Sequence, residues 1–146
     1  MPVLIDNRQT KRIALSSKTK LTAQVILNAL GCPDAELSIL LVDDPEIAAL
    51  NSNYLNRSGP TNVIAFPMRE GAFSDISPNL LGDVVISVDT AKREAHEAGI
   101  HPEERFIELL IHGILHLLGY NHETGAEEAL RMEEKTRELM RLVGGH

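Results

Sequence analysis

Four short apolar runs, separated by polar or helix-like segments, predict strands. They are Val3–Ile5, Glu36–Val42, Asn62–Met68 and Leu81–Val88. The third run contains Pro67, which has no N–H to donate to a neighbouring strand, so this run is expected at an edge of the sheet. Only the polar stretch 71–79 separates it from the fourth run, which indicates an antiparallel pair.

Apolar residues at helical spacing predict about five helices. The first ends at Gly31, and its apolar positions are Leu21, Val25 and Ala29, with Ile26 and Leu30 beside them. Asp44 is expected to cap the second helix, because Pro45 behind it suits a first helical turn. The second to fifth helices are expected at residues 44–56, 89–99, 102–118 and about 124–143.

The order of these elements predicts the fold class. Strands separated by a helix are expected to run parallel, whereas the third and fourth strands pair antiparallel. The expected fold is therefore α+β, a mixed four-stranded sheet with about five helices packed on it. Helix 102–118 is apolar on nearly every side, which predicts a buried, central position. The chain has 146 residues, the length of one domain, so residues 1–146 are expected to form a single domain.

The charge balance argues against a general nucleic-acid coat. The formal net charge is -7, whereas such proteins are usually basic, and no DNA partner is expected. Residues 1–30 differ, because Arg8, Lys11, Arg12, Lys18 and Lys20 outnumber a single aspartate there. This basic segment is suited to local contact with a polyanion, but the charge pattern alone favours the alternative, a solvated surface.

The sequence favours a cytoplasmic protein with no membrane partner. The single cysteine, Cys32, excludes an internal disulfide and fits a reducing compartment. No run approaches the ~20 apolar residues of a membrane span, and the first residues lack the apolar stretch of a signal peptide.

Three histidines near the end of helix 102–118 carry the clearest chemical signal. His112 and His116 are four residues apart, which places both on one helix face. Gly119 suits the end of the helix, after which His122 can return as a third ligand. Three imidazoles without a fourth protein ligand describe an open site for one Zn²⁺ ion, the kind that catalysis requires. The alternative is three histidines satisfied by hydrogen bonds. His96, His101 and His146 lack this spacing and are expected to be surface or capping residues.

This arrangement resembles the zinc signature of the metzincin peptidases, H-E-x-x-H-x-x-G-x-x-H. In that signature the glutamate after the first histidine is the general base. Gly113 occupies the corresponding position here and cannot accept a proton. Peptide hydrolysis by the metzincin route is therefore not expected.

The same segment also resembles the YbeY family of bacterial rRNA maturation factors, whose signature reads H-G-x-L-H-L-x-G-Y-D-H. Two upstream stretches extend the likeness. Residues 50–67 resemble L-N-x-x-Y-R…P-T-D-V-L-S-F-P, and residues 81–87 resemble L-G-D-I-x-I-S. The resemblance implies a zinc-dependent, single-strand-specific endoribonuclease in 16S rRNA 3′-end maturation and ribosome quality control. It implies single-stranded RNA, 16S rRNA and the small ribosomal subunit as partners.

Three positions depart from the family motifs. Leu55 stands where the family has an arginine, and Asn62 and Asn121 stand where the family has aspartates. Because leucine offers no contact to a phosphate, the nearby Arg57 is expected to supply RNA binding. Catalytic acid and base residues are left unassigned.

Two carboxylates near the motifs receive structural roles. Asp83 is expected to fix a turn. Glu108 lies one turn before His112 and is expected to pair with Arg105 rather than with a ligand imidazole.

Two other functions stay open at this point. One is a non-catalytic, zinc-stabilised ribosome-associated factor, which the three departures favour. The other is a metallohydrolase of a different substrate, such as a peptide lying along the predicted edge strand 62–68.

Overall fold

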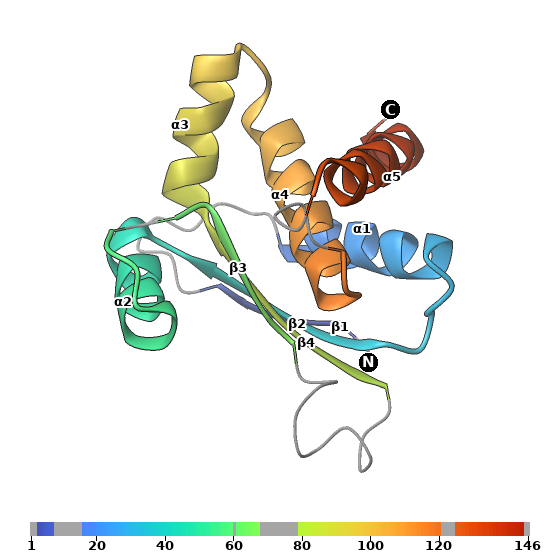
Figure 1. Ribbon diagram of the computed structural model, residues 1–146, viewed down its shortest axis with the longest axis horizontal. Helices are drawn as coiled ribbons and strands as arrows, with labels where there is room; N and C mark the ends of the chain where they lie inside the picture. Colours follow the sequence, from blue (N-terminus) through green and yellow to red (C-terminus); the bar gives the residue numbers. More distant parts are fainter. Residues whose placement is uncertain (1–2, 8–15, 60, 68–78, 121–124, 145–146) are drawn as a thin grey trace.

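A computed structural model describes residues 3–7, 16–59, 61–67, 79–120 and 125–144 (Figure 1). Within these ranges the helices and strands follow the predicted order. The strands are β1 (Val3–Asn7), β2 (Glu36–Val42), β3 (Val63–Pro67) and β4 (Leu80–Ser87). The helices are α1 (Ser16–Ala29), α2 (Asp44–Leu55), α3 (Val88–Ala98), α4 (Pro102–Leu117) and α5 (Ala126–Gly144).

The four strands form one mixed sheet in the order β1-β2-β4-β3. β2 pairs parallel with β1, from which α1 separates it, and with β4. Because β3 is antiparallel to β4, it also runs opposite to β2 although α2 separates the two, so the expectation that helix-separated strands run parallel is wrong for β2 and β3. β3 and β4 pair antiparallel, as their short connection predicts. Pro67 ends β3, which is an edge strand of the sheet. The expected α+β fold is confirmed.

Helices cover the two faces of the sheet unequally (Figure 1). α4 crosses one face together with α1 and α5, and α2 lies on the other side. The larger core cluster joins α4 to the first face, and a smaller one joins Ile47 of α2 to Val42, Ile64 and Val85. The central, buried position of α4 is therefore confirmed. No helix in the described ranges combines the length and the apolar character that crossing a membrane requires.

The apolar face expected for α1 is partly wrong, because Ile26 is buried as expected but Leu21, Val25 and Ala29 are exposed. The side chains of Leu21 and Val25 are 71% and 40% exposed, whereas Ala23, Ile26 and Leu27 are fully buried. Apolar residues surround this helix on several sides, so helical spacing alone does not select the packed side. The contacts with β1, α4 and α5 decide it.

Asp44 does not cap α2, contrary to expectation. The N-cap is Asp43, and the Asp44 carboxylate instead accepts hydrogen bonds from Ser87 Oγ (2.6 Å) and Thr90 Oγ1 (2.7 Å) at the start of α3. In return, Asp89 Oδ2 accepts a hydrogen bond from the Asp44 backbone N–H (3.0 Å). The first turns of α2 and α3 thus provide hydrogen-bond partners for each other. The two turns are distant in the chain, so local sequence rules cannot predict this pairing.

Candidate functional site

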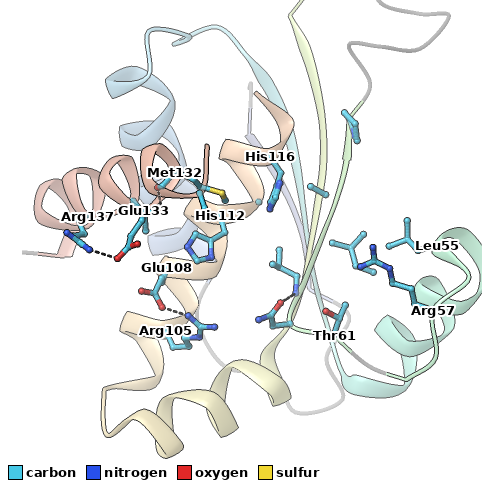
Figure 2. A pocket seen from close by; sticks show the side chains of 18 residues that line it. Leu55, Arg57, Thr61, Arg105, Glu108, His112, His116, Met132, Glu133 and Arg137 are labelled. Atoms are coloured by element: carbon cyan, nitrogen blue, oxygen red, sulfur yellow. Dashed lines mark hydrogen bonds and ion pairs between the residues drawn. The ribbon is translucent and has the colours of Figure 1, made fainter. Parts of the chain in front are cut away.

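α4 presents two of the predicted ligands. It begins at the N-cap His101, whose Nδ1 accepts a hydrogen bond from the Glu103 N–H (3.2 Å), so the predicted capping role of His101 is confirmed. His112 and His116 lie one turn apart in its second half. Both are half-buried and line a pocket of about 960 Å³ (Figure 2).

The third predicted ligand, His122, lies outside the described residues, as do Asn121 and His146. No three metal-binding side chains come together in the ranges that the structure covers. The ligand set of His112, His116 and His122 therefore stays a prediction.

Gly113 lies on the sheet-facing side of α4 and is buried. A Cβ built there would lie 2.6 Å from Val84 Cγ1 and 3.3 Å from Val63 Cγ2. Real Cβ atoms do not approach a neighbour within 3.0 Å, so even alanine requires a shift. Gly113 also lines the pocket, and the Cβ of a glutamate there would clash with Val84 on the sheet. The position that carries the metzincin general base is thus closed to a carboxylate here.

Arg57 and Leu55 also line the pocket. In Figure 2 they lie across β3 from the histidines. The C-cap of α2, Asn56, adopts a left-handed conformation (φ 54°), and the Arg57 N–H donates to the Asn51 carbonyl (3.2 Å). This turn carries Arg57 past the end of α2 to the pocket wall. Arg57 therefore lines the same pocket as His112 and His116, and its RNA contact stays a prediction.

A charged network borders His112. Arg105 pairs with Glu108, as predicted, and also binds Glu94 through Nη2 (2.9 Å) and Nε (3.0 Å). Asn62 Nδ2 donates to both Glu94 oxygens (3.3 Å). Burial alone would lower the pKa of Arg105, but hydrogen bonds to the two glutamates outweigh it and raise that pKa. The network joins β3, α3 and α4 beside the pocket.

Asp83 does not fix a turn, so this expectation is wrong. It lies within β4, paired with Ser38 of β2 and Phe66 of β3. Burial raises the pKa of its carboxyl. The residue does not line the pocket that contains the histidines.

One wall of the pocket comes from α5, which sequence reasoning did not assign to the site. Its residues on this wall are Ala129, Met132, Glu133, Thr136 and Arg137. Glu133 and Arg137 form an ion pair (Figure 2). Their spacing of four residues predicts such a pair on any exposed helix face, so only the packing of α5 against α4 connects them to the site.

The structure describes His96 and only part of the basic N-terminal segment. His96 is exposed, as predicted for a surface histidine. Lys18 pairs with Glu103 at the start of α4. Lys20 lies in α1 and is half-buried, and Arg8, Lys11 and Arg12 lie outside the described ranges.

Comparison with known proteins identifies the family. Residues 4–144 match the family model described as Endoribonuclease YbeY. A protein of that name from Syntrophotalea carbinolica is 55% identical over 137 residues, which cover 92% of this chain and 91% of the relative. One from Geobacter sulfurreducens is 49% identical over 144 residues, with 98% and 96% covered.

The fold agrees with this likeness. The solution structure of TM1509 from Thermotoga maritima superposes with a TM-score of 0.70 at 26% identity and covers 98% of this chain and 89% of that one. The sequence motifs, the matched family model and the shared fold agree. The chain therefore belongs to the YbeY family of endoribonucleases.

Proposed function

We propose that this chain is a zinc-dependent endoribonuclease that cleaves single-stranded RNA in 16S rRNA 3′-end maturation, acting on the small ribosomal subunit in the cytoplasm. Family membership supports RNA cleavage. The observation that carries the site is that His112, His116 and Arg57 line one pocket. The lone Cys32 suits a reducing compartment. Residues 1–146 act as one domain in this proposal.

The two described histidines fit a zinc ion. Their imidazoles are one helical turn apart on α4, half-buried and at the wall of the pocket. Imidazole nitrogen is a preferred zinc donor, and His122 would complete a three-histidine set. When bound, one Zn²⁺ supplies Lewis acidity to a phosphate oxygen and lowers the pKa of bound water.

The remaining pocket residues would position the RNA. The Arg57 guanidinium presents paired N–H donors that match two oxygens of one phosphate. Glu108 and Glu133 also line the pocket, and each is paired with an arginine, Arg105 and Arg137. These pairs offset negative charge that would repel a polyanion. Thus the pocket accepts a phosphodiester although the chain is acidic overall.

Cleavage of a labelled single-stranded rRNA fragment by purified protein with added zinc tests the proposal. We expect the wild type to nick this RNA and His116→Ala to leave it intact. His96→Ala is the matched control, because this exposed histidine lies on α3 and does not line the pocket. Equal nicking by wild type and His116→Ala would reveal a contaminating nuclease and contradict the proposal.

The same preparations separate the two other functions. A non-catalytic ribosome-associated factor would bind small subunits equally well before and after the His116→Ala change, and neither protein would cleave RNA. A peptidase would hydrolyse a peptide library when zinc is added. The exclusion of a glutamate at Gly113 argues against that outcome.

A further inference from the structure

The edge strand β3 forms one wall of the pocket. Of its residues, Val63, Ile64, Ala65 and Pro67 line the pocket. An edge strand presents backbone N–H and C=O groups that a bound molecule can use. Which of these groups point outward therefore decides which substrates the wall can bind. The inference below rests on the proposed function and specifies how the substrate is recognised.

The register of β3 and β4 identifies the outward groups. The Ser87 N–H donates to the Asn62 carbonyl (3.0 Å), which makes these two residues a hydrogen-bonded pair of an antiparallel ladder. Such pairs alternate along the strand, so Ile64 and Phe66 also turn their groups toward β4. Val63, Ala65 and Pro67 consequently turn theirs toward the free edge.

Only one of these three outward positions offers a donor. The Val63 N–H donates to the Asn62 side-chain oxygen (2.7 Å), and Pro67 has no N–H. The Ala65 N–H is the donor that is left. The Asn62 side chain thus caps the Val63 N–H. It can do so because its amide both accepts and donates: Oδ1 accepts a hydrogen bond from the Val63 N–H, while Nδ2 donates one to the Glu94 carboxylate (3.3 Å). An aspartate here would bring two carboxylates together.

We propose that the Ala65 N–H binds a phosphate oxygen of the RNA and that Asn62 closes this edge to extended peptides. A peptide that adds a strand needs alternating donors and acceptors along the edge, and capping Val63 removes one of them. A phosphodiester needs a donor only, which Ala65 provides. The outward carbonyls suit the ribose 2′-hydroxyl, a donor that DNA lacks. Asn62 is a positioning residue in this scheme, and Ala65 touches the substrate.

Replacing Ala65 tests the donor. Ala65→Pro removes the N–H at an outward edge position, where proline is tolerated, and Ala65→Ser keeps it. In a His116→Ala background, which leaves the probe intact, we expect Ala65→Pro to weaken binding of a single-stranded RNA about tenfold. Ala65→Ser should bind like its parent, and all variants should unfold at similar urea concentrations. Equal binding by both Ala65 variants would overturn the proposal.

A second measurement needs no substitution at Ala65. In ¹⁵N-labelled full chain carrying His116→Ala, the Ala65 amide proton should shift downfield as the RNA is added, and the Val63 amide should not. An unmoved Ala65 amide at saturating RNA would overturn the inference alone. Failure of the wild type to bind or cleave RNA would overturn the proposed function as well, so the two failures are distinguishable.

The role of Asn62 has its own test. An extended valine-rich peptide should leave the Val63 and Ala65 amides unchanged in the protein with Asn62. In an Asn62→Ala variant, the freed Val63 N–H should let the same peptide perturb both amides. Perturbation of both amides in the unsubstituted protein would overturn the capping role, and so would no response in Asn62→Ala.

Discussion

Gly113 of α4 and Val84 of β4 pack so closely that an added Cβ at the glycine would lie 2.6 Å from Val84 Cγ1. This contact sets the distance between the helix and the sheet. Since His112 directly precedes Gly113 and His116 lies three residues after it, the same contact positions both histidines relative to β3. The missing side chain at Gly113 thus allows the helix that carries the two histidines to pack close to the sheet.

Gly113→Ala should therefore destabilise the protein despite the higher helix propensity of alanine. Overpacking costs about 1–3 kcal/mol, and the propensity gain of about 1 kcal/mol offsets only part of it. Urea unfolding of Gly113→Ala alone and in a Val84→Ala background measures this. The cost should largely disappear when Val84 is truncated. An equal cost in both backgrounds would show that the two residues do not constrain each other.

Acid should weaken the junction between α2 and α3. Burial alone would raise the pKa of Asp44, but hydrogen bonds from Ser87, Thr90 and Arg93 outweigh it, so the pKa lies below its ordinary value of 3.8. A carboxyl whose pKa is lowered by folding stabilises the fold at every pH above its pKa in the unfolded chain. This stabilisation is lost as the pH falls through the pKa of the folded state.

Asp44→Asn should accordingly lower the free energy of unfolding by about 2 kcal/mol at pH 7, with a smaller loss below pH 3.8. Urea titrations at several pH values check this. Asp34→Asn, at an exposed position before β2, is the control and should change little at any pH. A pH-independent difference between wild type and Asp44→Asn would contradict this prediction.

Replacing Asp83 should change the stability in the opposite direction from replacing Asp44. Because burial raises the pKa of this carboxyl, ionisation above the raised pKa costs stability in the folded state. Asp83→Asn should therefore raise the urea midpoint at pH 7. The gain should vanish at a pH low enough to protonate Asp83 in the wild type. If Asp83→Asn were less stable at pH 7, the ionised carboxylate would have a favourable partner instead.

Metal removal should reduce both stability and activity. We expect about one zinc per chain in the wild type and much less in His112→Ala and His116→Ala, measured by elemental analysis. A chelator should lower the melting temperature and abolish RNA cleavage, because a metal that binds only the folded site stabilises it. The exposed His96→Ala should retain the metal. Full zinc content after loss of His116 would exclude it as a ligand.

Arg57→Gln should weaken RNA binding about fivefold to tenfold and make it less sensitive to salt. Losing one phosphate contact reduces the slope of log K against log salt by about 0.7 for a single strand. The control is Arg131→Gln, an exposed arginine of α5 that does not line the pocket. Leu55→Arg, which restores the family arginine, should strengthen binding. Identical salt slopes for Arg57→Gln and Arg131→Gln would place the phosphate contact elsewhere.

The sequence by itself determined the element order, the mixed sheet, the edge position of β3 and the shared face of His112 and His116. Each of these depends on patterns within a short stretch, such as the apolar runs, Pro67 at the end of β3, and the four-residue spacing of the histidines. The family resemblance also required only local motifs, and the comparisons confirm it.

Tertiary structure alone decided which side of α1 is buried, where the Asp44 carboxylate binds and which helix closes the pocket. Leu21 and Ile26 are both apolar, and only the packing partners of α1 distinguish them. Ser87 and Thr90 lie more than 40 residues from Asp44, and α5 forms a wall of the pocket because it packs against α4. Contacts between residues distant in the chain depend on how helices pack on a sheet, and a periodic pattern within one segment carries no information about its neighbours.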